Sequence, residues 1–285
     1  MKLFDQPNSL KEHLEKHISK HAKLGFVPTM GALHEGHISL VERSIAENEH
    51  TIISIFVNPT QFNKAEDLNN YPKTLDADLE KIKTLDSQSL LVFTPQAADI
   101  YTKTFSKKSY DFGGIEHEME GKYRSGHFDG VATIIEYFFH LIQPNNAYFG
   151  EKDYQQYLIV KKLAEQQFPA IKIVPCDIFR EKNGLAMSSR NLRLSDEARQ
   201  NAGIIYGTLL EVKNRLYKQP INRIEEYVEK TINNQKKFEL EYFCIADETS
   251  LKLVKKLAPK KNYRAFIAVF VEGIRLIDNI ALKEN

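Results

Sequence analysis

Residues 25–41 constrain the fold of this chain more than any other segment. A short apolar run at residues 25–27 is followed by a proline and two glycines, and then by a segment with helical apolar spacing at residues 38–45. This order predicts a buried strand, a tight turn and the start of a helix. The first turn of a helix has unpaired backbone N–H groups and carries roughly half a positive charge, and Gly31 and Gly36 leave room beside them. We therefore expect a phosphate-binding turn.

Two histidines lie within this turn. His34 and His37 are three residues apart, which places them about 60° apart around a helix, so both can face one ligand. A zinc-protease site is excluded because its histidines are four residues apart. The spacing alone would suit two surface histidines, but the adjoining strand, glycines and helix start favour a ligand site.

A second buried strand is predicted at residues 51–57 and ends in Asn58-Pro59-Thr60-Gln61-Phe62. Ligands of open α/β sheets bind beyond the carboxyl ends of the strands, so this loop and the histidine turn should border one crevice. Gln61 is the polar group that we expect against a substrate hydroxyl or carboxylate.

Three later segments carry further candidate residues. The Gly-rich stretch 110–130 contains Arg124 and His127, and a long polar loop of this kind is often functional. Residues 147–156 repeat the order of strand, glycine turn and helix. Residues 187–191 combine two hydroxyls with a guanidinium, which are donors that suit an oligophosphate. No P-loop pattern occurs in the chain.

Four motifs together carry a resemblance to a known family. They are P-T-M-G-A-L-H-E-G-H at 28–37, V-N-P-T-Q-F at 57–62, G-E-K-D-Y-Q-Q at 150–156 and M-S-S-R at 187–190. In this order they resemble the pantothenate synthetases (pantoate–β-alanine ligases) of the nucleotidyltransferase-like, adenylate-forming superfamily. The resemblance runs over nearly the whole chain.

The resemblance implies ATP-dependent condensation of pantoate with β-alanine through a pantoyl adenylate, with ATP as co-substrate and Mg²⁺ present. His34 and His37 are then the catalytic residues; His37 either protonates the leaving pyrophosphate or only donates a hydrogen bond. The implied ATP contacts are Met30, Gly31, Ala32, Leu33, His34, Glu35, Gly36, His37, Gly150, Glu151, Lys152, Asp153, Phe179, Met187, Ser188, Ser189 and Arg190. The implied contacts to pantoate or β-alanine are Pro28, Thr29, Gln61, Arg124, His127 and Gln156.

A metal ligand is harder to assign. Asp78 lies where relatives carry a denser acidic run, which Ala77 interrupts here. Acidic residues in a first helical turn normally interact with the helix dipole, so metal ligation by Asp78 is in doubt.

The expected fold is a Rossmann-like, doubly wound parallel α/β domain at residues 1–180, followed by a smaller α+β domain at residues 181–285 that begins with the M-S-S-R loop. The charge is balanced, with 39 basic and 38 acidic residues, so we expect no nucleic-acid partner. Two distant cysteines and the lack of a signal pattern or long apolar run predict a cytoplasmic protein without a membrane span. The resemblance also suggests a homodimer.

Local patterns predict further elements. The capping pattern Ser9-Leu10-Lys11-Glu12 predicts a helix that begins at Ser9. Apolar runs predict further buried strands at residues 89–95 and 171–175, and Asn183-Gly184 predicts a tight turn. In the second domain we expect two long helices at 196–217 and 221–236, and strands at 240–246 and 264–277, the latter folding into a hairpin at Glu272-Gly273.

Two other functions stay open at this point. One is a different adenylyltransferase of the same superfamily, although Gln61 and Gln156 favour a small hydroxy-acid substrate. The other is a non-catalytic nucleotide-binding module, which His34, His37, Lys152 and Arg190 argue against, because a module that only binds could have lost any of them.

Overall fold

The computed structural model describes residues 1–85, 88–102 and 104–282. The chain forms two compact units. The N-terminal unit comprises residues 1–151 and 155–177, and the C-terminal unit comprises residues 152–154 and 178–285. The division at Asp177–Ile178 falls close to the expected boundary at 180. The short segment Lys152–Tyr154, which the sequence places in the first domain, groups with the C-terminal unit.

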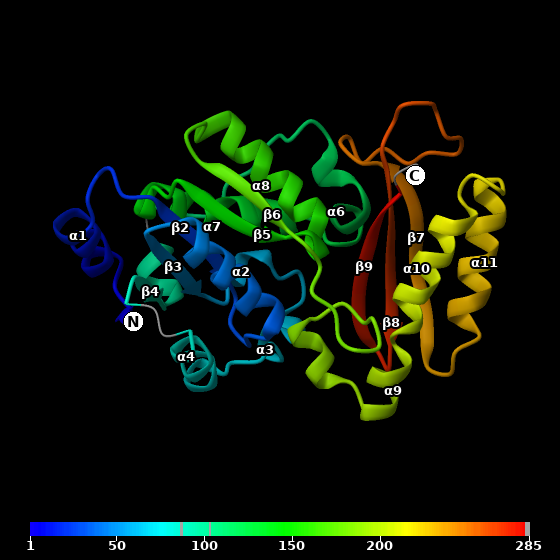
Figure 1. Ribbon diagram of the computed structural model, residues 1–285, viewed down its shortest axis with the longest axis horizontal. Coiled ribbons are helices and arrows are strands. Elements are labelled where there is room, and N and C mark those ends of the chain that lie inside the picture. The colour runs from blue at the N-terminus through cyan, green and yellow to red at the C-terminus, as the bar shows by residue number, and fades with distance from the viewer. Residues whose placement is uncertain (86–87, 103, 283–285) are drawn as a thin grey trace. The chain divides into compact units, whose positions relative to one another are not determined.

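The N-terminal unit is built on a six-stranded sheet in which every neighbouring pair is parallel (Figure 1). The strand order is β1-β4-β3-β2-β5-β6. The strands are β1 Lys2–Phe4, β2 Leu24–Thr29, β3 His50–Ile55, β4 Leu90–Phe93, β5 Asn146–Gly150 and β6 Lys172–Cys176. The expected α/β fold is confirmed. Strand β1, which pairs with β4, was not predicted.

Helices cover both faces of this sheet because successive strand residues point to opposite sides. On one face Phe26 and Phe93 contact Phe138 of α7 (His127–Ile142), with ring centroids 5.5 and 6.1 Å apart. On the other face Val27, Ile53 and Val92 share a buried cluster with Val41 of α2 (Glu35–Glu47) and Ile82 of α4 (Leu75–Lys83). Near-continuous burial on both faces is what the apolar strands predicted.

The remaining elements of the N-terminal unit are mostly short. They are α1 Pro7–His17, α3 Ala65–Asn69, α5 Ala97–Ile100, α6 Met119–Tyr123, α8 Tyr154–Gln167, whose first residue belongs to the C-terminal unit, and the 3₁₀ helices Pro59–Gln61 and Ile115–His117. Helix α1 begins at Pro7, where proline suits the first helical turn. A start at Ser9, expected from a capping pattern, is therefore wrong.

At the centre of the sheet, the direction in which the chain adds successive strands changes. Strand β2 pairs with β3 on one side and with β5 on the other, so the connections run outward in both directions from β2. Thr29 and Gly150 end these two central strands. A switch point of this kind is where open α/β sheets bind ligands.

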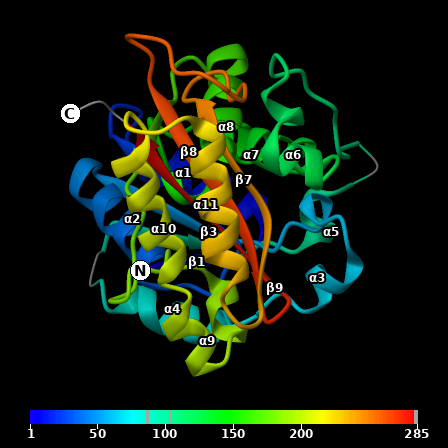
Figure 2. The same ribbon diagram turned by 90° about the vertical axis from the view of Figure 1, so that its right-hand side faces the viewer.

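The C-terminal unit contains a three-stranded antiparallel sheet of β7 (Phe238–Asp247), β8 (Tyr263–Val271) and β9 (Ile274–Leu282) (Figure 2). Its helices are α9 Asp196–Asn201, α10 Ile204–Arg215 and α11 Ile221–Asn233, with a 3₁₀ helix at Ser189–Arg193. Leu209 of α10 and Val228 of α11 share a buried core with Ile267 of β8. The predicted hairpin is present, and Glu272 and Gly273 in its turn have positive φ angles of 50° and 75°.

One helix in this unit was predicted too long. Residues 196–217 form two helices, which meet at Ala202 and Gly203. A Cβ on Gly203 would lie 2.3 Å from the carbonyl oxygen of Asn183. Only glycine allows this close approach, which apolar periodicity cannot reveal.

Helix α7 packs tightly against the loop that carries Gln61. The Nδ2 atom of Asn58 donates to the carbonyl oxygen of Gly130 at 3.0 Å, and a Cβ on Gly130 would lie 2.4 Å from the carbonyl oxygen of Thr60. The loop and the helix therefore fit together only if residue 130 is glycine.

We expect Gly130→Ala to lower the free energy of unfolding by about 1–3 kcal/mol, because the added methyl overpacks this contact. Gly207 of α10 is the matched control, since a Cβ there would meet no atom of the described residues within 4 Å. Gly207→Ala should be neutral or stabilising by up to about 1 kcal/mol through helix propensity. Urea unfolding followed by circular dichroism measures both; equal effects would contradict the close-packing argument.

Candidate active site

The turn after β2 has an unusual backbone. Gly31 and Ala32 both have positive φ angles, 79° and 48°. The hydroxyl of Thr29 supports the turn, accepting from the N–H of Gly31 at 3.3 Å and donating to the carbonyl oxygen of Ser54 at 2.7 Å. Two consecutive left-handed residues bring successive N–H groups to one side of the chain, where they can bind an anion.

The anion at these N–H groups is a side chain of the protein. Asp78 of α4 accepts from the N–H of Ala32 at 2.9 Å and from the N–H of Leu33 at 2.7 Å. The carboxylate is only 1% exposed. Asp78 therefore occupies the backbone amides of Ala32 and Leu33, two residues that the resemblance places among the ATP contacts.

His34 caps helix α2 and His37 lies in its first turn. The N–H of His34 donates to Nδ1 of His37 at 3.3 Å, and the two rings stack with centroids 3.9 Å apart. Because Nδ1 of His37 accepts a hydrogen bond, the neutral ring carries its proton on Nε2. Nε2 is then a hydrogen-bond donor suited to an anionic ligand.

Gln61 is held in place by its neighbours. Its Oε1 accepts from Nδ2 of Asn58 at 3.1 Å, and its Nε2 lies 2.7 Å from Sδ of Met30. The side chain of Asn58 is fixed in turn by Tyr101, whose hydroxyl donates to Oδ1 at 2.6 Å. Gln61 is 8% exposed, so its carboxamide is positioned by protein contacts before any ligand arrives.

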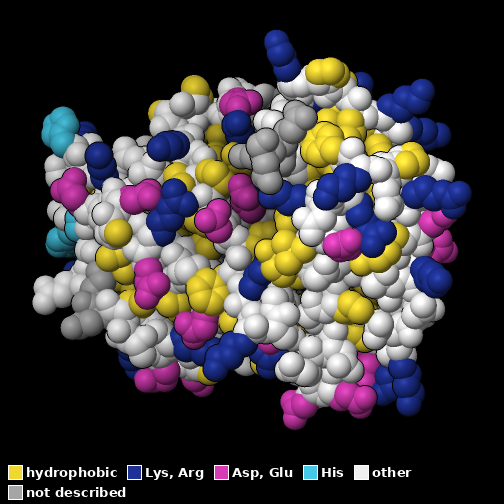
Figure 3. All heavy atoms as spheres, turned by 45° about the vertical axis from the view of Figure 1, so that its right-hand side comes forward, with side chains coloured by type: hydrophobic (Ala, Val, Ile, Leu, Met, Phe, Trp, Pro, Cys, Tyr) yellow, Lys and Arg dark blue, Asp and Glu magenta, His cyan; other side chains and the backbone are white. Residues whose placement is uncertain are grey.

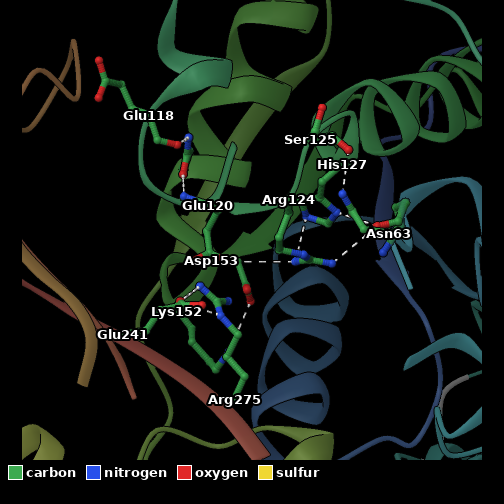
Figure 4. Close-up of polar contacts among 12 residues, drawn as sticks. Asn63, Glu118, Glu120, Arg124, Ser125, His127, Lys152, Asp153, Glu241 and Arg275 are labelled. Carbon is green, nitrogen blue, oxygen red and sulfur yellow. Dashed lines mark hydrogen bonds and ion pairs between the residues drawn. The ribbon is translucent and has the colours of Figure 1, made fainter. Parts of the chain in front are cut away.

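Arg124 and His127 lie next to Gln61, and Figure 4 shows the arginine and the histidine side by side. Nδ1 of His127 is 2.8 Å from the carbonyl oxygen of Gln61, and its Nε2 is 3.2 Å from Nη1 of Arg124. Figure 4 also draws Asn63, whose Nδ2 donates to the carbonyl oxygen of Ser125 at 2.6 Å. The structure thus brings together three of the residues that we expected to bind substrate.

The other predicted residues of the N-terminal unit lie at the ends of its central elements. Pro28 and Thr29 end β2, Gly150 ends β5, and Glu151 follows it. Gln156 lies in the first turn of α8. A Cβ on Gly150 would meet no atom of the described residues within 4 Å, so protein packing does not require a glycine there.

In the C-terminal unit, residues 178–187 form a narrow hairpin that leads into the M-S-S-R loop. The N–H of Met187 donates to the carbonyl oxygen of Phe179 at 3.0 Å, and the backbones of Arg180 and Ala186 pair in an antiparallel β-bridge. The side chain of Phe179 is 44% exposed. The turn falls at Asn183-Gly184, where the sequence predicted it.

The M-S-S-R loop is anchored by an asparagine that the sequence analysis did not single out. Nδ2 of Asn191 donates to the carbonyl oxygen of Ala186 at 3.1 Å and to Oε1 of Glu181 at 2.8 Å. Ser188 caps the following 3₁₀ helix, its Oγ accepting from the N–H of Arg190 at 3.2 Å. Ser189 is buried and Arg190 half-buried.

Lys152 belongs to the same unit as this loop. Its carbonyl oxygen accepts from Nδ2 of Asn279 at 2.9 Å, and its Nζ is 3.7 Å from the carboxylate of Asp153. The ring of Tyr154 lies 3.8 Å from the guanidinium of Arg264. These contacts fix Lys152 to the C-terminal sheet, so Lys152 and residues 188–190 are carried by one compact unit.

The described residues do not offer Mg²⁺ a ready-made site. Among them no group of three or more His, Cys, Asp or Glu side chains could hold a metal ion. Both oxygens of Asp78, the one candidate ligand, accept backbone N–H groups inside the protein. The geometry of Asp78 therefore does not fit a metal ligand.

Comparison with known proteins agrees with these motifs. A family model described as pantoate-beta-alanine ligase matches residues 2–281. The chain belongs to the pantoate–β-alanine ligase family. It is 50% identical over 283 residues to a pantothenate synthetase of Flavobacterium psychrophilum, covering 99% of this chain and 100% of the relative. A pantothenate synthetase of Bacteroides thetaiotaomicron is 40% identical, and each chain is fully covered.

Solved structures of the family have the same fold. The pantothenate synthetase of Thermus thermophilus superposes with a TM-score of 0.90 at 33% identity, covering 100% of both chains. The pantoate-beta-alanine ligase of Francisella tularensis, solved with beta-gamma ATP and beta-alanine, gives 0.80 at 33% identity and covers 100% of this chain and 99% of that one.

Sequence reasoning missed several residues that hold this ligase site together. Asp78 was considered only for the helix dipole or as a metal ligand, and Asn58, Asn191 and Asn279 were not considered at all. For Asp78 the sequence did offer a signal: Asp78 and Lys81 are three residues apart on one predicted helix, so both can face the same segment. Nothing local marks Asn279, because its partner Lys152 is far away in the sequence.

The geometry of His37 predicts its tautomer. In protein labelled with ¹⁵N-histidine, the nitrogen shifts of His37 at a pH of about 8 should show protonated Nε2 and unprotonated Nδ1. His37→Ala identifies the signals. A ring protonated on Nδ1 would contradict the hydrogen bond from His34.

Proposed function

We propose that this chain condenses pantoate with β-alanine at the expense of ATP, giving pantothenate, AMP and pyrophosphate through a pantoyl adenylate. The observation that carries the proposal is the pairing of His34 and His37 at the start of α2 in the unit that also holds Gln61 beside Arg124 and His127. An imidazole donor suits a phosphate, and the Gln61 group suits a small hydroxy acid. Membership of the ligase family supports the same reaction.

The chemistry requires no nucleophile from the protein. A carboxylate oxygen of pantoate attacks the α-phosphorus of ATP, the bond from that phosphorus to the β-phosphate oxygen breaks, and pyrophosphate leaves. The amine of β-alanine then attacks the acyl carbon, the bond to the AMP oxygen breaks, and the amine loses a proton. The protein has to align the reactants and stabilise the charge that develops on the phosphates.

Different residues of the chain perform these two tasks. His37, with its proton on Nε2, donates to a phosphate oxygen, and His34 lies stacked beside it. Lys152, Ser188, Ser189 and Arg190 supply further donors to the phosphates. The carboxamides of Gln61 and Gln156 bind the hydroxyls or carboxylate of pantoate. The Francisella tularensis relative was solved with beta-gamma ATP, which supports ATP as co-substrate.

Three finer points belong to the same proposal. Mg²⁺ accompanies the ATP phosphates, because magnesium in such sites is held largely by substrate oxygens and water. The protein acts as a homodimer in the cytoplasm, which light scattering and cell fractionation would test.

Among the described residues no helix has the length and apolar character needed to cross a membrane. Acidic and basic side chains both occur on the face in Figure 3.

Isotope transfer tests the reaction directly. With pantoate labelled by ¹⁸O in its carboxylate, one labelled oxygen should appear in AMP when product pantothenate forms, because that oxygen bridges acyl carbon and phosphorus in the adenylate. Mass spectrometry of AMP and phosphate measures it. Label in inorganic phosphate, or ADP as the nucleotide product, would mean an acyl phosphate and overturn the proposal.

The two glutamines should act on one substrate. We expect Gln61→Ala and Gln156→Ala to raise the KM for pantoate by roughly 5- to 150-fold while changing the KM for ATP little, since an unpaired buried polar group costs about 1–3 kcal/mol. Gln167→Ala, an exposed residue of the same helix as Gln156, is the control. An equal rise in the KM values for pantoate and ATP would show that the glutamines do not bind pantoate specifically.

A further inference from the structure

Helix α4 holds both backbone groups of Leu33. The N–H of Leu33 donates to Oδ1 of Asp78 at 2.7 Å, and its carbonyl oxygen accepts from Nζ of Lys81 at 2.5 Å. Asp78 also accepts from the N–H of Ala32 through its other oxygen. Residues 78 and 81 are one turn apart and lie on the same face of the helix. The turn before His34 is therefore fixed at three backbone atoms.

The burial of Asp78 makes this contact strong. The carboxylate is 1% exposed and accepts a third hydrogen bond from Oγ1 of Thr74 at 3.2 Å. Burying a carboxylate is costly unless hydrogen bonds compensate for its lost hydration. The backbone amides of residues 32 and 33 supply that compensation, so the position of the turn and the burial of Asp78 depend on each other.

Helix α4 supports the turn through Asp78 and Lys81, and the Thr29 hydroxyl supports it at Gly31. Gly31 and Ala32 have left-handed backbones, which are unfavourable for Ala32 in isolation. A Cβ on Gly31 would lie 3.1 Å from Oδ2 of Asp78, so the carboxylate packs directly on the turn as well as bonding to it. Loss of the carboxylate would remove the acceptor that Asp78 offers to the N–H groups of Ala32 and Leu33.

We propose that Asp78 is a positioning residue for the catalytic histidines: it holds the turn at residues 31–33 so that His34 and His37 are placed before ATP binds. The inference rests on the proposed function for the role of the histidines, but the contact itself does not. His34 follows Leu33 directly and donates to His37. A displacement of about 1 Å in catalytic groups can cost about 100-fold in rate.

The alternative role for Asp78, as a ligand of Mg²⁺, makes different predictions. A metal ligand must be reachable by the ion, whereas Asp78 is 1% exposed and each of its oxygens already accepts an N–H group of the turn. If Asp78 bound Mg²⁺, the amides of Ala32 and Leu33 would be protected only after metal or nucleotide binds. As a positioning residue, Asp78 protects them at all times.

The first test uses the wild-type protein without metal or nucleotide, in EDTA. Residue-resolved hydrogen exchange by NMR should show slow exchange at the amides of Ala32 and Leu33. Fast exchange that becomes slow only after Mg²⁺ and ATP are added would overturn the proposal. This result does not depend on any activity, so it remains decisive even if the reaction proposed above is wrong.

The second test uses Asp78→Asn, which presents an NH₂ group to one backbone N–H, with Asp76→Asn as the matched control on the same helix. Asp76 is exposed, and Asp78 is not. In Asp78→Asn we expect exchange at Ala32 and Leu33 to accelerate by roughly 10- to 100-fold, as loss of a hydrogen bond to a charged group implies. The control should exchange like the wild type.

Kinetics separate the two roles of Asp78. We expect Asp78→Asn to lower kcat by roughly 10- to 100-fold, with KM for pantoate and the half-saturating Mg²⁺ concentration within about twofold of wild type. A rise of roughly tenfold or more in half-saturating Mg²⁺, with amide exchange unchanged, would identify a metal ligand instead. Unchanged kcat together with faster exchange would reduce Asp78 to a purely structural residue.

Discussion

The site depends on the left-handed backbone at Gly31 and Ala32, immediately after the central strand β2. This geometry turns the chain sharply enough for helix α2 to begin at Glu35, so the two histidines lie at its first turn. Left-handed conformations are costly for residues other than glycine, and the buried carboxylate of Asp78 offsets that cost with two hydrogen bonds to the turn. Other parts of the N-terminal unit serve this arrangement: β3 provides the carbonyl that Thr29 binds, and α4 provides Asp78.

The sequence predicted the parts of the fold that depend on local pattern. Apolar runs located β2 to β6, and the turn chemistry of Asn183-Gly184 and Glu272-Gly273 located two reversals. Strand β1 was missed because it has three residues and no periodicity. The break between α9 and α10 was missed; it falls at Gly203, which lies close to the carbonyl of Asn183, a contact that local pattern cannot reveal. Sequence reasoning therefore failed where tertiary contact, rather than local preference, decides the backbone.

The same division applies to the candidate site. Residues with reactive or charged groups, such as His37 and Arg190, could be recognised from their chemistry and motifs. The residues that hold them could not, since Asn279 supports Lys152, and Asn191 supports the M-S-S-R loop, through hydrogen bonds to main-chain carbonyls. Any sequence can supply a carbonyl, so such a partner leaves no signature. The grouping of Lys152–Tyr154 with the C-terminal unit, against the expected boundary, has the same origin.

Buried polar residues beside the motifs share one physical role. Asn58, Asp78 and Asn191 are each at most 2% exposed, and each bonds to main-chain atoms of a loop or helix next to predicted ligand contacts. An unsatisfied buried polar group costs about 1–3 kcal/mol, so each of these residues is stable only if its partner segment adopts the observed conformation. The loops are therefore shaped in the unliganded protein, and a ligand does not have to provide the energy to order them. Catalysis of adenylate formation depends on alignment and on charge stabilisation, both of which lose effect if the donors must first reorganise. The interactions that stabilise the fold at these loops are thus the same ones that make the site competent for adenylation.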